Sequence, residues 1–181
     1  MIIGLTGYAQ SGKDTVAQIL VDKFGFTRVA FADPIRDFCY QVNPIVGWVA
    51  GEAIMLKNVV DRDGWDEAKK SDSVRRTLQN VGVAARDNFG DTFWIVRAFE
   101  KVKDAENIVV TDVRFRNEAD YIKSYENSQI WRVRRPGVTA VNSHVSESQM
   151  ENYKVDQIFA NNGTVDELEL LVKTRMRGLL V

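Results

Sequence analysis

Short apolar runs alternate with helix-like patterns along the chain. Three runs have the length and the residues of buried β-strands: 2–6, 107–111 and 129–133. Weaker strand candidates lie at 27–31 and 155–159. Apolar residues at helical spacing predict helices in the intervening segments, at 16–24, 33–38, 74–85, 93–102 and 165–176. This alternation predicts an α/β fold: a three-layer sandwich around a mostly parallel sheet of five strands.

Two stretches lack a clear pattern, 43–70 and 136–153. In an α/β sandwich, such stretches are natural places for insertions that bind a substrate. The sequence has no repeat, low-complexity tract or interdomain linker, and 181 residues suffice for one domain with a sizeable core. We therefore expect a single domain over 1–181.

Composition narrows the range of partners. The chain has 24 basic and 25 acidic residues, and its aromatic residues are scattered, so we expect no binding to nucleic acid or to an anionic membrane. No apolar segment approaches the length of a membrane span. Cys39 is the only cysteine, which excludes an internal disulfide, and together with the only histidine, His144, it cannot form a zinc site. These features predict a cytoplasmic protein.

The strongest motif lies between the first strand and the first helix. Residues 7–15 read Gly-Tyr-Ala-Gln-Ser-Gly-Lys-Asp-Thr and match the pattern G-x-x-x-x-G-K. Gly7 and Gly12 permit backbone torsions that a side chain would obstruct, so that backbone amides and the helix start can face phosphate oxygens. Lys13 adds a mobile ammonium. The motif predicts a phosphate-binding loop, with a chance glycine-rich turn as the alternative. The candidate residues are Gly7, Gln10, Ser11, Gly12, Lys13, Asp14 and Thr15.

One position departs from the usual motif. Asp14 follows the lysine, where Ser or Thr normally contacts magnesium, and Thr15 comes next. A carboxylate is a good ligand for Mg²⁺, although it would repel the phosphates unless the metal lay between them. Asp14, directly or through water, and Thr15 are therefore candidate magnesium ligands. The alternative is that Asp14 only stabilises the N-terminus of the helix.

A second acidic residue ends a predicted strand. Asp112 directly follows the apolar run 107–111, at the position where a carboxylate can bind a magnesium-bound water. Arg114 could project into the same crevice at the carboxyl ends of the strands, and its guanidinium suits phosphate. The alternative for Asp112 is a turn-forming residue. For Arg116 and Glu118, a solvated first helical turn is as good an interpretation as any functional role.

One predicted helix carries a polar face that could bind a phosphorylated acceptor. Arg75 and Gln79 are four residues apart and share a face, and Arg86 lies about two turns further along. Arginine can hold a phosphate, and an amide can bind the edge of a nucleobase. Arg36 is a further candidate. The alternative is an ordinary amphipathic helix with its polar residues in solvent. Trp94 could stack on a base, or it could belong to the core.

Three arginines cluster before Pro136. Alternation places Arg132 and Arg134 on one side of a strand, so at least one of them is expected to be exposed. Arg134 and Arg135 lie where a closing segment would begin, and arginines on such a segment would stabilise charge on a transferred phosphoryl group. We expect no chemical role for His144, because phosphoryl transfer scarcely needs a strong base.

Together, these motifs resemble one known family. The resemblance rests on the loop 7–15, Phe-Ala-Asp-Pro-Ile-Arg at 31–36, the segment 75–86, Thr-Asp-Val-Arg-Phe-x-Asn-Glu at 111–118 and Asn-Asn-Gly-Thr at 161–164. Over about residues 1–175, the chain is similar to the bacteriophage-type deoxynucleoside monophosphate kinases of the P-loop kinase superfamily. The resemblance implies a P-loop kinase fold with an acceptor-binding insertion at about 33–90 and a lid at about 135–153.

The resemblance also implies cofactors, a substrate and roles for single residues. ATP and Mg²⁺ are the implied cofactors, and a deoxynucleoside monophosphate is the implied acceptor, phosphorylated to the diphosphate. The implied catalytic residues are Lys13, Asp112 and Arg114, and Arg134 and Arg135 join them as candidates by their position at the start of the lid. The implied metal ligands, partly through water, are Asp14, Thr15 and Asp112. Arg36, Arg75, Gln79 and Arg86 fall where the acceptor should lie. Asn161 falls in the segment that passes near the adenine in related kinases.

Other functions stay open at this point. Dephospho-coenzyme A kinases share the loop, the lid plan and the late Asn-Gly, and animal-type phosphomevalonate kinases share Gly-Lys-Asp. A non-catalytic ATP-binding regulator would lack an acceptor site or a lid arginine, and the chain has candidates for both. The region 46–70, with Trp48 and Trp65, matches no family element, so the base preference is undetermined. Assembly as a homodimer is also undetermined. A phage-encoded protein of this kind would act in the host cytoplasm.

Overall fold

The computed structural model describes residues 1–139 and 149–180. By its internal contacts the chain divides into two compact units. The core unit comprises Met1–Phe31 and Phe99–Val181, and the inserted unit comprises Ala32–Ala98. The segment expected to bind the acceptor, 33–90, lies within the inserted unit. No helix in the described part of the chain is long and apolar enough to cross a membrane.

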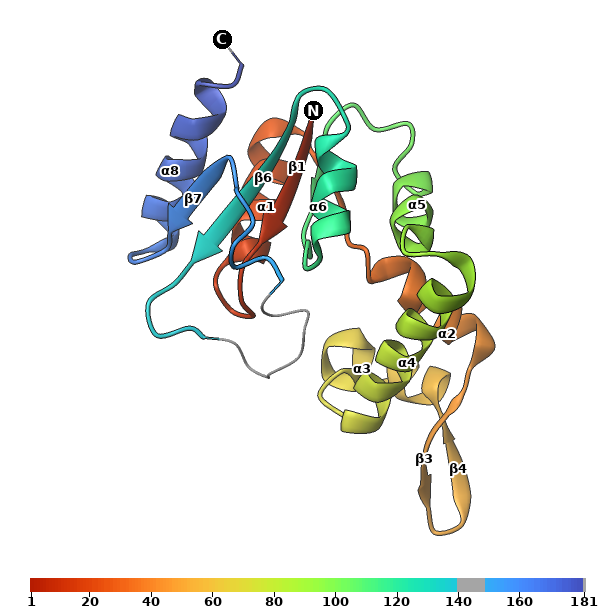
Figure 1. Ribbon diagram of the computed structural model, residues 1–181. Helices are drawn as coiled ribbons and strands as arrows, with labels where there is room; N and C mark the ends of the chain where they lie inside the picture. Colours follow the sequence, from red (N-terminus) through yellow and green to blue (C-terminus); the bar gives the residue numbers. More distant parts are fainter. Residues whose placement is uncertain (140–148, 181) are drawn as a thin grey trace. The chain divides into compact units, whose positions relative to one another are not determined.

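A parallel sheet forms the centre of the core unit. Its strands are β1 (Ile2–Thr6), β2 (Thr27–Val29), β5 (Ile108–Val110), β6 (Ser128–Arg134) and β7 (Gln157–Ala160), in the order β2-β5-β1-β6-β7. Each neighbouring pair is parallel (Figure 1). All five residues of the central strand β1 are buried, as expected for a strand covered on both faces. The five predicted strands are confirmed, and the sheet is wholly parallel.

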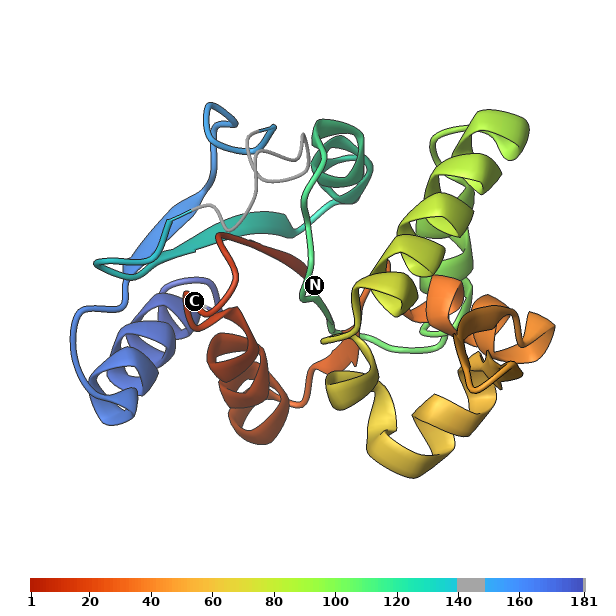
Figure 2. The same cartoon turned by 90° about the horizontal axis from the view of Figure 1, so that it is seen from below.

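Helices cover both faces of this sheet. Figure 2 shows α1 (Lys13–Phe24) and α8 (Val165–Arg177) on one face and α6 (Arg116–Lys123) on the other. A Cβ atom added to Gly4 of β1 would lie only 2.8 Å from Ile122 of α6, so the glycine allows this helix to approach closely. The three-layer prediction is confirmed.

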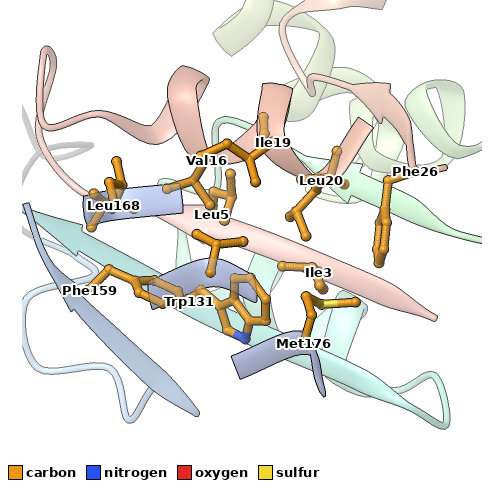
Figure 3. Close-up of a cluster of buried hydrophobic side chains, with 14 residues drawn as sticks. Ile3, Leu5, Val16, Ile19, Leu20, Phe26, Trp131, Phe159, Leu168 and Met176 are labelled. Atoms are coloured by element: carbon orange, nitrogen blue, oxygen red, sulfur yellow. The ribbon is translucent and has the colours of Figure 1, made fainter. Parts of the chain in front are cut away.

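A hydrophobic cluster lies between the sheet and the pair α1 and α8. Figure 3 shows Trp131 of β6 at its centre, with Leu5 of β1 and Val16 of α1 beside it. Trp131 is fully buried and meets the ring of Phe159 edge-on at a centroid distance of 5.2 Å. Burying side chains of this size contributes about 1.5–3 kcal/mol each. This cluster fixes the strand that leads into the phosphate-binding loop.

The helix boundaries follow from glycine and capping residues. Gly25 has φ 69° and ends α1, and its N–H donates to the Val21 carbonyl at 3.2 Å. Thr164 caps α8, because its hydroxyl accepts the Glu167 N–H and the Glu167 carboxylate accepts the Thr164 N–H. The helices expected at 16–24 and 165–176 are both confirmed, and they end and begin at these residues.

The inserted unit is mostly helical. It contains α2 (Asp33–Val42), α3 (Leu56–Ala68), α4 (Asp72–Phe89) and the first part of α5 (Phe93–Glu100). Cys39, Leu56 and Val74 are buried in its own small core. The helix expected at 93–102 ends at Glu100, and Val102 is buried in the turn that follows.

The segment 43–70 is more regular than its sequence suggests. It forms a hairpin of β3 (Ile45–Val49) and β4 (Glu52–Met55), followed directly by α3. Ala50 and Gly51 form the hairpin turn with φ values of 50° and 84°. Alanine is unusual at a turn position with positive φ, so the usual Asn-Gly or Asp-Gly signal is missing. The interpretation of this segment as irregular is therefore wrong.

Candidate active site

The core unit contains a pocket of about 440 Å³. It lies where β1, β5 and β6 end, because its lining comes from the loop after β1, the segment after β5 and the segment that ends β6. All five side chains expected to act in catalysis line it: Lys13, Asp112, Arg114, Arg134 and Arg135. The carboxyl ends of parallel strands are the usual ligand-binding edge of an open α/β sheet.

The loop at 7–15 depends on two glycines. Gly7 has φ 139° and Gly12 has φ 105°, a region that other residues rarely adopt. A Cβ on Gly7 would lie 2.3 Å from the Val133 carbonyl oxygen, and a Cβ on Gly12 would lie 2.5 Å from Nδ2 of Asn161. Gln10 also has a positive φ, 63°. The loop has the compact backbone of a phosphate cradle, and a side chain at either glycine would disrupt it.

Ser11 provides an independent sign of a ligand. Its side chain is only 1% exposed and lines the pocket. Among the described residues, its Oγ has no hydrogen-bond partner. A buried hydroxyl without a partner costs about 1–3 kcal/mol. Oxygen-rich ligands such as phosphates would satisfy it, so the loop fits the group that the motif predicts.

Lys13 closes over the same loop. Its ammonium donates to the carbonyl oxygen of Gly7 at 2.8 Å and to that of Tyr8 at 2.7 Å. These bonds hold the positive charge at the pocket wall. A flexible ammonium of this kind can follow charge on a phosphate as a point charge.

Asp112 forms the turn that its position allowed and also lines the pocket, and its role towards magnesium stays a prediction. Its Oδ1 accepts the backbone N–H of Phe31 at 2.7 Å, which ties the end of β5 to the residues after β2. The next N–H, that of Val113, donates to the Leu5 carbonyl of β1 at 3.0 Å. The turn interpretation therefore holds for one oxygen, and the carboxylate still lines the pocket.

The other two candidate metal ligands lie outside the pocket lining. The Asp14 side chain is 86% exposed, and its Oδ1 lies 3.7 Å from a guanidinium nitrogen of Arg28. Thr15 is half-buried one residue further along α1. No side chain caps α1, because its N-cap residue is Gly12, so Asp14 is not the cap. Its role as a metal ligand stays a prediction.

A sequence comparison decides the family. A model of the family "Deoxynucleotide monophosphate kinase" matches residues 47–172. The chain belongs to this family. A protein of Acanthamoeba polyphaga mimivirus, described as "Putative deoxynucleotide monophosphate kinase", is 28% identical over 183 residues. That alignment covers 92% of this chain and 91% of the viral protein. The chain is thus a kinase by family, a phosphotransferase of the nucleotide-binding type.

Solved structures support the fold of the chain. Shikimate kinase from Aquifex aeolicus aligns with a TM-score of 0.50 at 12% identity, covering 100% of this chain and 99% of that one. TT1252 from Thermus thermophilus also aligns with a TM-score of 0.50, at 17% identity, covering 99% and 97%. At such identities the likeness concerns the fold alone, and that fold is the P-loop kinase sandwich.

The four residues expected to bind the acceptor all belong to the inserted unit of the kinase. Arg75 and Gln79 are exposed on α4, and Arg75 is hydrogen-bonded to Asp72 of the same helix. Arg86 is half-buried, and its Nε donates to the Gly82 carbonyl at 3.2 Å. In α2, Nη1 of Arg36 lies 3.3 Å from Oδ1 of Asp33. Their role towards an acceptor stays a prediction.

Trp94 is a core residue. It is 5% exposed, and its Nε1 donates to the Gly82 carbonyl at 3.0 Å. Its ring meets Phe93 and Phe38 edge-on. Of the two interpretations of this tryptophan, packing in the core is the one that the structure supports.

Asn161 contacts the phosphate-binding loop. Its Nδ2 donates to the Ser11 carbonyl at 2.9 Å, and its backbone N–H donates to the Arg134 carbonyl at 2.7 Å. The residue therefore links the end of β7 to two walls of the site. Its expected position near an adenine stays a prediction.

The three arginines of β6 and its extension have different environments. Arg134 is exposed, as expected for at least one of the pair that shares a side. Arg132 is 8% exposed and donates to the carbonyls of Met150 and Tyr153. Burial, with a smaller contribution from Arg134, lowers the pKa of Arg132 below its usual range. The described parts of the expected lid are 135–139 and 149–153, and His144 lies outside the described residues.

Two contacts at the site were not foreseen. Glu118 of α6 is 8% exposed. Its Oε2 accepts the N–H groups of Arg114 at 2.7 Å and Phe115 at 3.0 Å. The interpretation of Glu118 as a solvated residue is therefore wrong. For Arg116, which is exposed, it holds. The Tyr8 hydroxyl donates to Glu151 across the pocket lining. Sequence reasoning could have found the capping role of Glu118, because an acid three residues after the N-cap residue often accepts backbone N–H groups at the start of a helix.

Proposed function

We propose that this protein transfers the γ-phosphoryl group of ATP to a deoxynucleoside monophosphate and so forms the diphosphate. The observation that carries the proposal is the convergence of Lys13, Asp112 and three arginines on one pocket beside a phosphate-binding loop. Membership of the deoxynucleotide monophosphate kinase family supports the choice of acceptor.

The donor side is built from the loop and its lysine. Lys13 and the backbone amides of 7–15 would bind the phosphates of ATP, and the buried Ser11 hydroxyl offers a further donor. The side chains that would hold magnesium are Asp112 on the pocket wall and, directly or through water, Asp14 and Thr15. Mg²⁺ held there would supply positive charge that neutralises part of the charge on the phosphates.

The acceptor side is assigned to the inserted unit. Arg36, Arg75 and Arg86 supply guanidinium groups that suit a monophosphate, and the Gln79 amide suits the edge of a base. These side chains already lie on two neighbouring helices of one unit, because α2 and α4 pack against each other. The assignment predicts that their loss raises KM for the acceptor more than KM for ATP.

Transfer itself needs positioning and charge stabilisation more than a base. Arg114, Arg134 and Arg135 would neutralise charge on the transferred phosphoryl group. In-line placement of donor and acceptor would supply the remaining rate acceleration. Placement of this kind can lower a barrier by about 7–11 kcal/mol.

An ADP-release assay tests the proposal. ATP and Mg²⁺ are supplied with each of the four common deoxynucleoside monophosphates in turn, and with dephospho-coenzyme A in a separate reaction. We expect ADP release with at least one deoxynucleotide. Turnover with dephospho-coenzyme A alone would support the rival kinase class, and ATP binding without turnover on any acceptor would support a regulator.

Replacing Lys13 tests the donor site. Lys13→Ala should lower kcat/KM by at least about a hundredfold, because it removes the mobile charge aimed at the transferred phosphate. Lys23→Ala, in the last turn of the same helix, serves as the matched control and should keep normal activity. Near-normal turnover by Lys13→Ala would contradict the phosphate role.

A further inference from the structure

The segment that follows β5 has an unusually complete set of backbone partners. The N–H of Val113 donates to the Leu5 carbonyl of β1, and the N–H groups of Arg114 and Phe115 both donate to Oε2 of Glu118. Three consecutive amides are thus held, two of them by one carboxylate. This segment carries Asp112 and Arg114, both of which line the pocket.

Glu118 does more than cap its helix. An acid at the third position of a helix ordinarily accepts the N–H of the N-cap residue, which here is Phe115. Phe115 has no side-chain acceptor, so only the glutamate half of a capping box exists. The additional bond to the Arg114 N–H reaches one residue further back, into the pocket wall. Helix capping requires the first bond and not the second.

The environment of Glu118 makes its position rigid. The side chain is 8% exposed, and charge-assisted bonds from amides to a carboxylate are about twice as strong as neutral ones. The neighbouring residues Val113 and Ala119 are buried at 2% and 0% exposure, so the short loop has little freedom to shift. Glu118 thereby fixes the backbone from which the exposed Arg114 side chain starts.

We propose that Glu118 is a positioning residue that sets Arg114 against the phosphate-binding loop. The inference rests on the proposed function, since it assigns to Glu118 an effect on catalysis through Arg114. A misplacement of about 1 Å at a reacting group can lower a rate by about a hundredfold, so the backbone of Arg114 is a sensitive point.

Steady-state kinetics of three Glu118 variants test this. Glu118→Ala removes both bonds, and Glu118→Asp keeps the charge but is too short to hold both amides. Both should lower kcat by about tenfold or more with little change in KM for ATP. Glu118→Gln keeps an oxygen that can accept both N–H groups and should stay within about threefold of the wild type. Glu118→Asp carries the test if Glu118→Ala does not fold.

Glu167 provides the matched control. It occupies the same third position in α8, completes a true capping box with Thr164 and is not part of the pocket lining. Glu167→Ala should lower Tm to a similar extent as Glu118→Ala and leave kcat unchanged. Equal losses of kcat in the two variants would mean that only stability is measured, and would overturn the inference.

A double-mutant cycle with Arg114→Ala separates this inference from the proposed function. If Glu118 acts through Arg114, Glu118→Asp should cause no further loss of kcat in the Arg114→Ala background. An undiminished additional loss there, or a normal kcat for Glu118→Asp in the presence of Arg114, overturns the inference alone. A normal kcat for Arg114→Ala overturns both the inference and the proposed role of Arg114.

Discussion

The candidate residues of the site differ in the groups that their side chains contact. Lys13 and Asp112 are held by backbone groups of the phosphate-binding loop and of the residues after β2. Asp14 instead faces solvent beside Arg28. An exposed ion pair of this kind adds little to stability. Asp14 lies in the first turn of α1, where an acid also stabilises the N-terminus of a helix, so only an experiment separates that role from a contact with magnesium.

Replacing Asp14 tests the metal role. Asp14→Ala should raise the Mg²⁺ concentration for half-maximal activity by about tenfold, as is typical when an outer ligand is lost. Activity is titrated against Mg²⁺ at saturating ATP. Asp22→Ala, an exposed acid on the same helix, is the control. An unchanged magnesium requirement in Asp14→Ala would leave Asp14 without a part in metal binding.

At the scale of elements, β6 does more than pair with its neighbours. Its buried Arg132 donates to the carbonyls of Met150 and Tyr153, and Glu151 between them accepts the Tyr8 hydroxyl of the loop. Three segments far apart in sequence are joined in this way. The contacts place residues 150–152 along the pocket wall.

Removing the buried guanidinium should weaken this junction. Arg132→Met keeps the length and apolar stem of the side chain but leaves two carbonyls without their donor. We expect a loss of about 2–4 kcal/mol in the free energy of unfolding, measured by urea denaturation. Arg134→Met, two residues along the same strand and exposed, should change it by less than about 0.5 kcal/mol. Equal effects of the two changes would contradict a structural role for Arg132.

The elements of the core unit were predictable because each has a local signal. The run 2–6 is apolar, Gly25 stops α1 and Thr164 starts α8. The hairpin of β3 and β4 was missed because its turn has alanine at positive φ. Strand order could not be predicted, since β1 pairs with strands more than a hundred residues away.

The candidate site, too, was predictable only where its residues belong to local motifs. Lys13 and Asp112 belong to motifs with fixed spacing from a strand, so their meeting in one pocket could be expected. The bonds of Glu118 and Arg132 depend on where backbone amides and carbonyls lie after folding. Sequence patterns record residue types and not those positions, which is why a solvated position and a functional role were equally open for Glu118.

At the scale of the whole molecule, both units contain groups that resist losing a proton. Burial raises the pKa of Cys39 in the inserted unit to about 11. In the core unit, a hydrogen bond with Tyr125 raises the pKa of Tyr121 to about 12, and burial with a bond to Asp120 raises that of Tyr153 to about 12. In each case the folded state holds its proton more tightly than the unfolded state.

The stability should therefore fall at alkaline pH. A raised pKa contributes stability that is complete below the unfolded value, about 9 for Cys39, and that is lost as the pH rises towards 11. Urea denaturation from pH 8 to 11 should show this decline in the wild type. Cys39→Ala should show a shallower decline over the same range, although its stability at pH 8 is lower. Parallel curves for the two proteins would argue against a buried neutral thiol.

The two carbonyl bonds of Lys13 also bear on selectivity among solutes. An ammonium that is already satisfied by Gly7 and Tyr8 gives up those partners only to a competitor of higher charge density. Nucleosides and other neutral adenine compounds have no group of high charge density that could bind the ammonium in place of the carbonyls, whereas a polyphosphate has one. If the loop binds the donor phosphates as proposed, these bonds would disfavour weakly charged metabolites before any contact with a base forms.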